Sequence, residues 1–202
     1  MSIVGLDLSL RATGVAVIGY DLVADADGRN QRHEPCVLRL RTVGRDGIKG
    51  EGYPERSRRI VAQTRRVLAA LPAAGIDLAV IEGPSYGSQH GAQMDRYALW
   101  MGVYSSMQAQ GVPIAVVAPG TREKWATGSV PRGIDRKARK ARVLAAVRDM
   151  WPDERIRDDD EADALVLATI GAHHLGWPLP FETKERHTTG LQAVEWPEGV
   201  GA

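Results

Sequence analysis

The chain has 202 residues, which fits one domain of ordinary size, and its composition of 44% hydrophobic and 25% charged residues is typical of a globular protein. Its formal net charge of +1 gives no overall case for nucleic-acid binding, so any basic surface has to be local. No apolar stretch reaches the roughly 18 residues of a membrane helix, Cys36 is the single cysteine, and the first ten residues lack a signal-peptide pattern, so we expect a cytoplasmic protein with no membrane contact.

The chain is predicted to open with three antiparallel strands. Residues 2–10 and 13–22 are apolar, β-branched runs separated by a short turn, and residues 36–44 alternate apolar side chains with Arg39 and Arg41. Apolar residues then recur at helical spacing, which predicts a helix over 53–75. The continuous apolar run 76–84 is typical of a central strand that ends at a loop.

Helices and strands alternate in the second half. The pattern predicts a helix over about 91–110, a buried strand over 112–120, a basic loop, and helices over about 135–150 and 160–175. This order predicts an α/β fold: a central five-stranded mixed sheet, with three antiparallel strands and then two parallel ones, flanked by helices. We expect residues 1–175 to form this domain, and the Pro-, Gly- and charge-rich residues 176–202 to be a tail that packs loosely or is disordered.

Acidic residues stand at three element ends. Asp7 lies in the first strand, Glu82 ends the fourth, and DDDEADALVLATIGAHH opens the last helix. Each alone has an ordinary structural interpretation, as a turn cap, an edge residue or a helix cap. If the first and fourth strands are parallel neighbours, however, these acids converge, and so many like charges need divalent cations to neutralise them. Oxygen ligands without His or Cys favour Mg²⁺ or Mn²⁺ over zinc.

Helical spacing indicates which acids of the cluster face the same way. Residues three or four apart share a helix face, so Asp163 pairs with Asp160 or with Asp159. We choose Asp160, and we assign Asp158 and Asp159 to the cap and the first turn. Glu161 is about 100° away around the helix, and we expect it to be solvated.

Three short motifs resemble the signatures of RuvC-like Holliday junction resolvases, which belong to the RNase H-like nuclease superfamily. They are GLDLSLRATG (5–14), VIEGPSY (80–86) and DDEADALVLA (159–168), and the likeness covers residues 1 to about 175. It implies the active-site acids Asp7, Glu82, Asp160 and Asp163, with two Mg²⁺ or Mn²⁺ ions per site and no organic cofactor. It also implies a homodimer that cuts four-way DNA junctions by paired phosphodiester hydrolysis.

A basic segment, residues 121–142, lies between two of these motifs. A solvated helix face is the ordinary interpretation of such a run. Its place between the motifs favours contact with DNA phosphates, which makes binding depend on salt. The resemblance implies that Lys124 and Lys140 bind the scissile strand, with Lys137 an alternative to Lys140. The full set expected on DNA from this segment is Arg122, Lys124, Arg132, Arg136, Lys137, Arg139 and Lys140.

Two further features concern partners. Tyr86, four residues past Glu82, could stack on a base at a junction or simply pack on the next helix; an aromatic residue near this place acts as a wedge in the family. The helix predicted over 91–110 carries more apolar surface than one buried stripe requires, which fits pairing with its copy in a two-fold dimer.

Other function classes stay open. Another RNase H-like nuclease, cutting flaps, forks, Y structures or hybrids, would use the same acids with a different groove. A non-catalytic junction-binding protein would need the basic segment but not the four acids. The DNA sequence that would be cut, and a phage or bacterial origin, also stay open.

Overall fold

The computed structural model describes residues 1–24, 31–48, 50–84 and 93–200. Five strands and six helices are assigned in these residues: β1 (Ser2–Asp7), β2 (Thr13–Ala24), β3 (Gln31–Val43), α1 (Tyr53–Ala69), β4 (Ile76–Glu82), α2 (Gln93–Gln108), β5 (Ile114–Val117), α3 (Pro119–Thr127), α4 (Arg136–Met150), α5 (Asp159–His174) and α6 (Glu185–Leu191). Among these helices, none has the length and apolar character needed to cross a bilayer.

The strands form one mixed sheet in the order β3-β2-β1-β4-β5. β1 pairs with β2, and β2 with β3, in antiparallel fashion, whereas β1 pairs with β4, and β4 with β5, in parallel. The predicted fold class is confirmed, and β1 and β4 are the parallel neighbours that the convergence of Asp7 and Glu82 requires. The third strand starts at Gln31 rather than at residue 36, because β3 follows β2 along its whole length.

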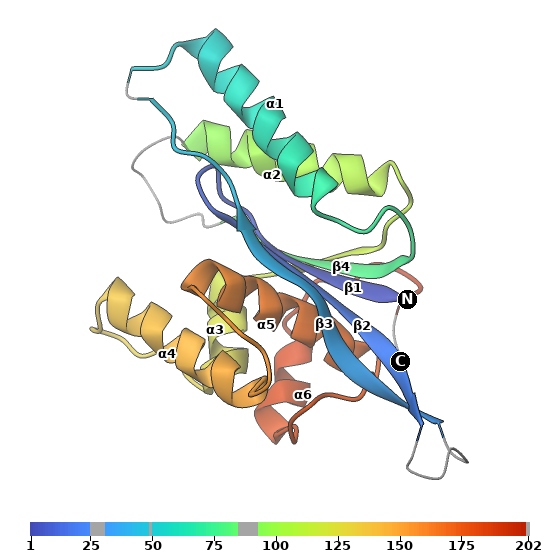
Figure 1. Cartoon of the computed structure of the whole chain (residues 1–202). Coiled ribbons are helices and arrows are strands. Elements are labelled where there is room, and N and C mark those ends of the chain that lie inside the picture. The colour runs from blue at the N-terminus through green and yellow to red at the C-terminus, as the bar shows by residue number, and fades with distance from the viewer. Residues whose placement is uncertain (25–30, 49, 85–92, 201–202) are drawn as a thin grey trace.

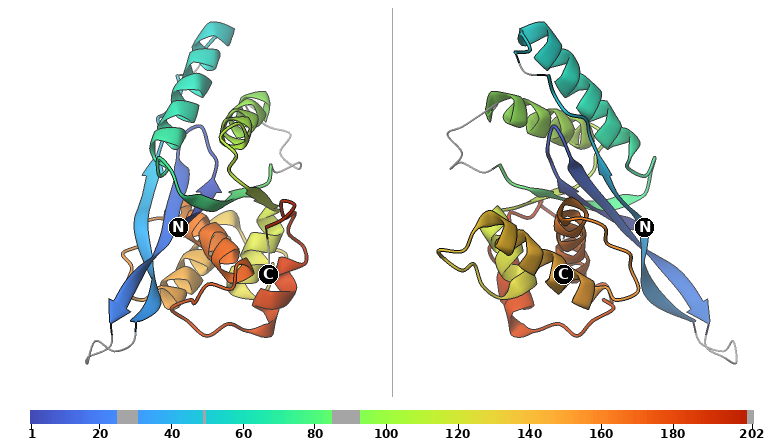
Figure 2. Two further views of the ribbon diagram at one scale, coloured as in Figure 1. Left: turned by 90° about the vertical axis from the view of Figure 1, so that its right-hand side faces the viewer. Right: turned by 60° about the vertical axis from the view of Figure 1, so that its left-hand side comes forward.

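Helices cover both faces of the sheet. α1 and α2 lie on one face, and α3, α4, α5 and α6 lie on the other, as the views in Figures 1 and 2 agree. Strand residues alternate between the two cores, since successive side chains point to opposite faces. In β1, Ile3 belongs to the α5 core, whereas Val4 and Leu6 belong to the α1–α2 core. In β4, Val80 and Ile81 divide in the same way.

α5 lies directly against the middle of the sheet because two glycines leave room for its backbone. A Cβ atom at Gly5 of β1 would overlap the carbonyl oxygen of Ala164. A Cβ atom at Gly14 of β2 would overlap the carbonyl oxygen of Asp160. Any larger residue at either position would push the helix away. The first turns of α5 are therefore held beside the end of β1 and the start of β2.

Two segments differ from their expected structure. The basic segment begins inside a helix, α3, whose first residue is Pro119, a favourable residue at that position because it has no N–H to leave unpaired. Residues 176–200, expected to pack loosely, contain α6. Val194 is buried in the α5 core, and Trp177 and Phe181 pack against it. The domain boundary near residue 175 stays a prediction.

Candidate active site

Asp7 and Glu82 end two neighbouring parallel strands. Leu6 of β1 pairs with Ile81 of β4, so the next position of each strand carries an acid. Because side chains alternate along a strand, both acids lie on the α5 side of the sheet. Two further contacts fix the end of β4: the indole N–H of Trp100 donates to the Glu82 carbonyl oxygen at 2.8 Å, and the Gly83 N–H donates to the Val117 carbonyl at 2.8 Å.

The start of α5 is tied to the sheet by its capping residue. The Asp158 carboxylate accepts a hydrogen bond from the Glu161 backbone N–H at 2.8 Å, as expected of an N-cap. The Thr42 hydroxyl of β3 donates to the same carboxylate at 3.2 Å. Asp160 and Asp163 follow in the first turns, on the part of the helix that Gly14 admits to the sheet.

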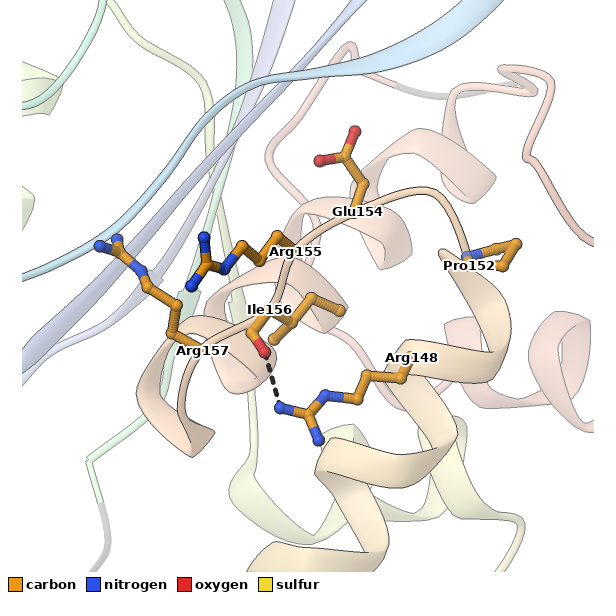
Figure 3. A pocket seen from close by; sticks show the side chains of 6 residues that line it. All are labelled: Arg148, Pro152, Glu154, Arg155, Ile156 and Arg157. Atoms are coloured by element: carbon orange, nitrogen blue, oxygen red, sulfur yellow. Dashed lines mark hydrogen bonds between the residues drawn. The ribbon is translucent and has the colours of Figure 1, made fainter.

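The expectation that Glu161 is solvated is wrong. Its side chain is only 1% exposed, and its carboxylate accepts hydrogen bonds from the Arg157 backbone N–H and from Arg157 Nε, both at 2.8 Å. Arg157 lies four residues before Glu161, just ahead of the N-cap of α5, and supplies this partner. Arg148 of α4 also holds this connection, since its guanidinium donates to the Ile156 carbonyl at 2.7 Å (Figure 3).

A pocket of about 520 Å³ lies at this α4–α5 connection (Figure 3). Its lining consists of Arg148, Pro152, Glu154, Arg155, Ile156 and Arg157. None of the four predicted catalytic acids lines it. Arg148 and Arg157 are engaged by protein atoms, so we interpret these arginines as holding the segment that leads into α5.

All four predicted acids line a second cleft, of about 560 Å³. The structure thus brings Asp7, Glu82, Asp160 and Asp163 together from β1, β4 and α5. Of the residues expected on DNA, the cleft is also lined by Arg122, Arg136, Arg139 and Lys140. The remaining lysines and arginine of that set, Lys124, Arg132 and Lys137, are exposed and outside the cleft lining. Tyr86 lies outside the described residues.

Arg122 has a position that the sequence analysis did not foresee. It was grouped with the phosphate-binding residues of a loop, but α3 places its side chain among the acids, with only 11% of it exposed. Arg122 Nε donates to Glu82 Oε1 at 2.6 Å, and Arg122 Nη1 donates to Asp163 Oδ1. The buried Trp125 and Ala126 on the same helix were the available sequence signal that this segment packs inward.

The other basic residues of the cleft differ in their partners. Lys140 of α4 forms an ion pair with Asp159 and has its Nζ atom 3.8 Å from Asp160 Oδ1. Arg139 pairs with Glu123, a buried acid of α3, at 3.0 Å between Nε and Oε2. Lys140 therefore lies beside the candidate catalytic acids, whereas Arg139 serves a different carboxylate.

No protein-family model matches the sequence, and a search of curated proteins finds no match. Solved structures match its fold. RuvC from Thermus thermophilus matches with a TM-score of 0.63 and 16% identity, over 97% of this chain and 99% of that chain. The chain has the fold of the RuvC resolvases. RuvC from T. thermophilus in complex with a Holliday junction substrate gives 0.58 and 20%, over 83% and 90% of the two chains. The fowlpox virus resolvase, in complex with Holliday junction DNA, gives 0.51 and 12%, over 84% and 95%.

Within this RuvC fold the acids crowd one another. Burial raises the pKa of Asp7 to about 7, the charge of Glu82 adds to the rise, and Arg122 partly offsets it. Burial likewise raises the pKa of Asp163 to about 6, which Arg122 counteracts and Asp7 reinforces. The pKa of Asp160 is raised by burial, against the influence of Lys140. Burial is thus the main reason that the pKa values of these acids are raised, with repulsion between neighbouring carboxylates adding to it.

The donor set fits a hard divalent cation, because it consists of carboxylate oxygens alone. As the side chains stand in the described parts of the chain, no three His, Cys, Asp or Glu residues are placed to hold an ion. Arg122 engages two of the four predicted acids, Glu82 and Asp163. The guanidinium thus occupies one oxygen atom of each of these two carboxylates.

Proposed function

We propose that this chain is a divalent-metal-dependent endonuclease that resolves four-way DNA junctions. The observation that carries the proposal is the gathering of Asp7, Glu82, Asp160 and Asp163, from three separate elements, in one cleft that basic side chains also line. The burial of Asp7 and Asp163 argues against a purely structural role, because buried carboxylates close to one another cost stability unless a cation compensates them. The shared fold with junction-bound resolvases supports the substrate class.

The four acids would hold Mg²⁺ or Mn²⁺, and two such ions would activate a water molecule and stabilise the charge that develops on the phosphate. The protein supplies the geometry. Asp7 and Glu82 are fixed by the sheet, and Asp160 and Asp163 by a helix that cannot shift away without opening the contacts at Gly5 and Gly14. Because the sheet and the helix are rigid, they would hold the metal-binding carboxylates in position without further ordering of the chain.

Basic residues at the cleft would position the DNA strand. Arg136 and Lys140 lie on the cleft wall formed by α4, so a phosphate backbone that enters the cleft meets them beside the acids. Exposed Lys124, Arg132 and Lys137 would extend the contact outside the cleft. Such contacts give affinity without reading sequence, which suits an enzyme that selects DNA shape.

We further propose that the active form is a homodimer that pairs through α2. Met94 and Met101 of this helix are 58% and 52% exposed, which is high for large apolar side chains. Trp100 and Tyr104 stack on the same helix with 5.1 Å between ring centroids. A two-fold pair would present two cleavage sites to the two symmetric strands of a junction.

A cleavage assay on branched DNA tests the proposal. Purified protein is incubated with labelled four-way, Y-shaped, flap and linear DNA, in Mg²⁺ and in chelator. We expect paired nicks in the four-way junction in Mg²⁺ and none in chelator. Asp7→Asn should abolish cleavage but retain junction binding, since it removes one metal ligand and no basic group.

The other outcomes select the alternatives. Preferred cleavage of flaps or Y structures would indicate another RNase H-like nuclease, and equal cleavage of all four substrates a general nuclease. Junction binding without cleavage by the wild-type protein at any divalent cation concentration would indicate a binding protein. Cleavage in chelator would contradict the metal-dependent mechanism.

A further inference from the structure

Arg122 joins two of the four acids from the opposite wall of the cleft. Its Nε atom contacts Glu82 at 2.6 Å, and its Nη1 atom contacts Asp163, so one side chain of α3 bridges β4 and α5. All three side chains are largely buried, with exposures of 11%, 17% and 6% for Arg122, Glu82 and Asp163. These contacts therefore belong to the protein interior and are not those of a mobile surface ion pair.

The Arg122 guanidinium stays positively charged inside the cleft. Arginine stays protonated in proteins, and a buried charge is costly unless it is paired. Arg122 is therefore held in the cleft by the acids, and its positive charge in turn offsets the repulsion between Glu82 and Asp163. A planar guanidinium with donors on two edges suits this task, because it contacts two carboxylates at once where a lysine would offer a point charge.

A metal ion and Arg122 compete for the same oxygens. Glu82 Oε1 and Asp163 Oδ1 are occupied by N–H donors of Arg122, and a divalent cation at those atoms would stand next to a positive guanidinium. Both cations cannot use the same two oxygen atoms in contact geometry. Each carboxylate keeps a second oxygen, but a divalent ion bound there would still lie close to the positive guanidinium, so metal binding and the pairs with Arg122 oppose each other.

We propose that Arg122 is a built-in counter-cation that holds Glu82 and Asp163 in the metal-free protein and is displaced when divalent ions bind. It is a positioning residue: it keeps the acids close to one another without metal, and it weakens metal affinity in return. The inference rests on the proposed function, because it takes these acids to be the metal-binding group. Arg122 and the metal are then linked, so that each reduces the affinity of the acids for the other.

Metal binding without DNA tests the link. Mn²⁺ affinity is measured by calorimetry for the wild-type protein, for Arg122→Gln and for Arg139→Gln. We expect Arg122→Gln to bind Mn²⁺ roughly tenfold more tightly, an effect within the usual range for coupled sites, and to have a lower melting temperature in chelator. Arg139→Gln is the matched control, because it removes a positive charge from the same cleft without touching the four acids; its Mn²⁺ affinity should stay within about twofold of the wild type.

Unchanged or weaker Mn²⁺ binding by Arg122→Gln would overturn the inference, and so would an equal gain in Arg139→Gln. Arg122→Lys adds a second comparison and should bind Mn²⁺ with intermediate affinity, since it keeps the charge but not the two-edged contact.

A measurement on the wild-type protein covers the case in which the variants fail to fold. The Arg122 Nε–H signal in a ¹⁵N correlation spectrum should move when Mg²⁺ saturates the protein, because its bond to Glu82 opens. A signal that stays in place at saturation, or a wild-type protein that binds no divalent ion, would overturn the inference. These readouts contain no DNA, so displacement of Arg122 in a protein that cuts no branched substrate would reject the proposed function alone.

Discussion

At the scale of single residues, Asp7 is an acid at the end of a buried strand. It ends β1 beside Glu82, where burial and like charges raise its pKa to about 7 from an ordinary value of 3.8. Between those pH values the folded, metal-free protein binds a proton that the unfolded chain has released. The contribution of Asp7 to stability is therefore present at low pH and is lost as the pH rises through 7.

This gives a pH-dependent prediction for thermal unfolding in chelator. At pH 8, Asp7→Asn should melt at a higher temperature than the wild type, because it removes a buried negative charge. At pH 5.5 the difference should shrink, since the wild-type carboxyl is then mostly protonated. Mg²⁺ should stabilise the wild type more at pH 8 than at pH 5.5. A melting difference that does not change with pH would contradict the raised pKa.

The single residues that sequence analysis missed share one cause. The four acids could be chosen because Asp7 and Glu82 end strands, and Asp160 and Asp163 lie in the first turns of a helix, whose patterns are readable in the sequence. Arg122 depends on tertiary contacts with Glu82 and Asp163, which no local spacing encodes. Glu161 pairs with Arg157 only four residues away, but its burial depends on how α5 packs in the folded protein.

At the scale of the element, the placement of α5 decides whether the acids meet. Continuous apolar runs, and one alternating segment, predicted the strands, and the structure places β1 and β4 as the parallel neighbours that the convergence of the acids required. The close packing of α5 on the sheet depends on Gly5 and Gly14. A glycine in a strand has several ordinary explanations, so the sequence alone does not predict this contact. α3 was missed for a related reason, because the charges of residues 121–142 dominate its few buried side chains.

Gly14→Ala tests whether α5 needs its close contact with the sheet. The added methyl group meets the backbone of Asp160, so the substitution should lower the free energy of unfolding by about 1–3 kcal/mol, as overpacking does. Mn²⁺ affinity should fall as well, because Asp160 moves relative to Asp7. The free energy is measured by urea denaturation.

Gly120→Ala is the matched control. No atom lies within 4 Å of a Cβ at this glycine of α3, so its stability should change by no more than about 0.5 kcal/mol. Equal effects of the two substitutions would show that α5 does not need the close contact.

At the scale of the whole molecule, the sheet lies between two helix layers (Figures 1 and 2). The cleft is lined by residues of β1, β4, α2, α3, α4 and α5, and Met94 and Met101 are exposed on α2. A dimer that pairs through these methionines would therefore form beside the cleft of each chain.

Light scattering at micromolar concentration tests the dimer. We expect the mass of two chains for the wild type and of one chain for Met101→Glu, because a buried charge at the interface would be unpaired. Val61→Glu is the comparison variant, since Val61 is 46% exposed on α1 and outside the proposed contact. A wild-type monomer, or dimers in all three proteins, would contradict pairing through α2.

The most direct measurement is the anomalous signal of Mn²⁺ in crystals of the protein. We predict manganese peaks bounded by the carboxylates of Asp7, Glu82, Asp160 and Asp163, with the Arg122 guanidinium turned away from Glu82 and Asp163. Manganese bound elsewhere while these four acids stay without it at saturating concentration would contradict the account.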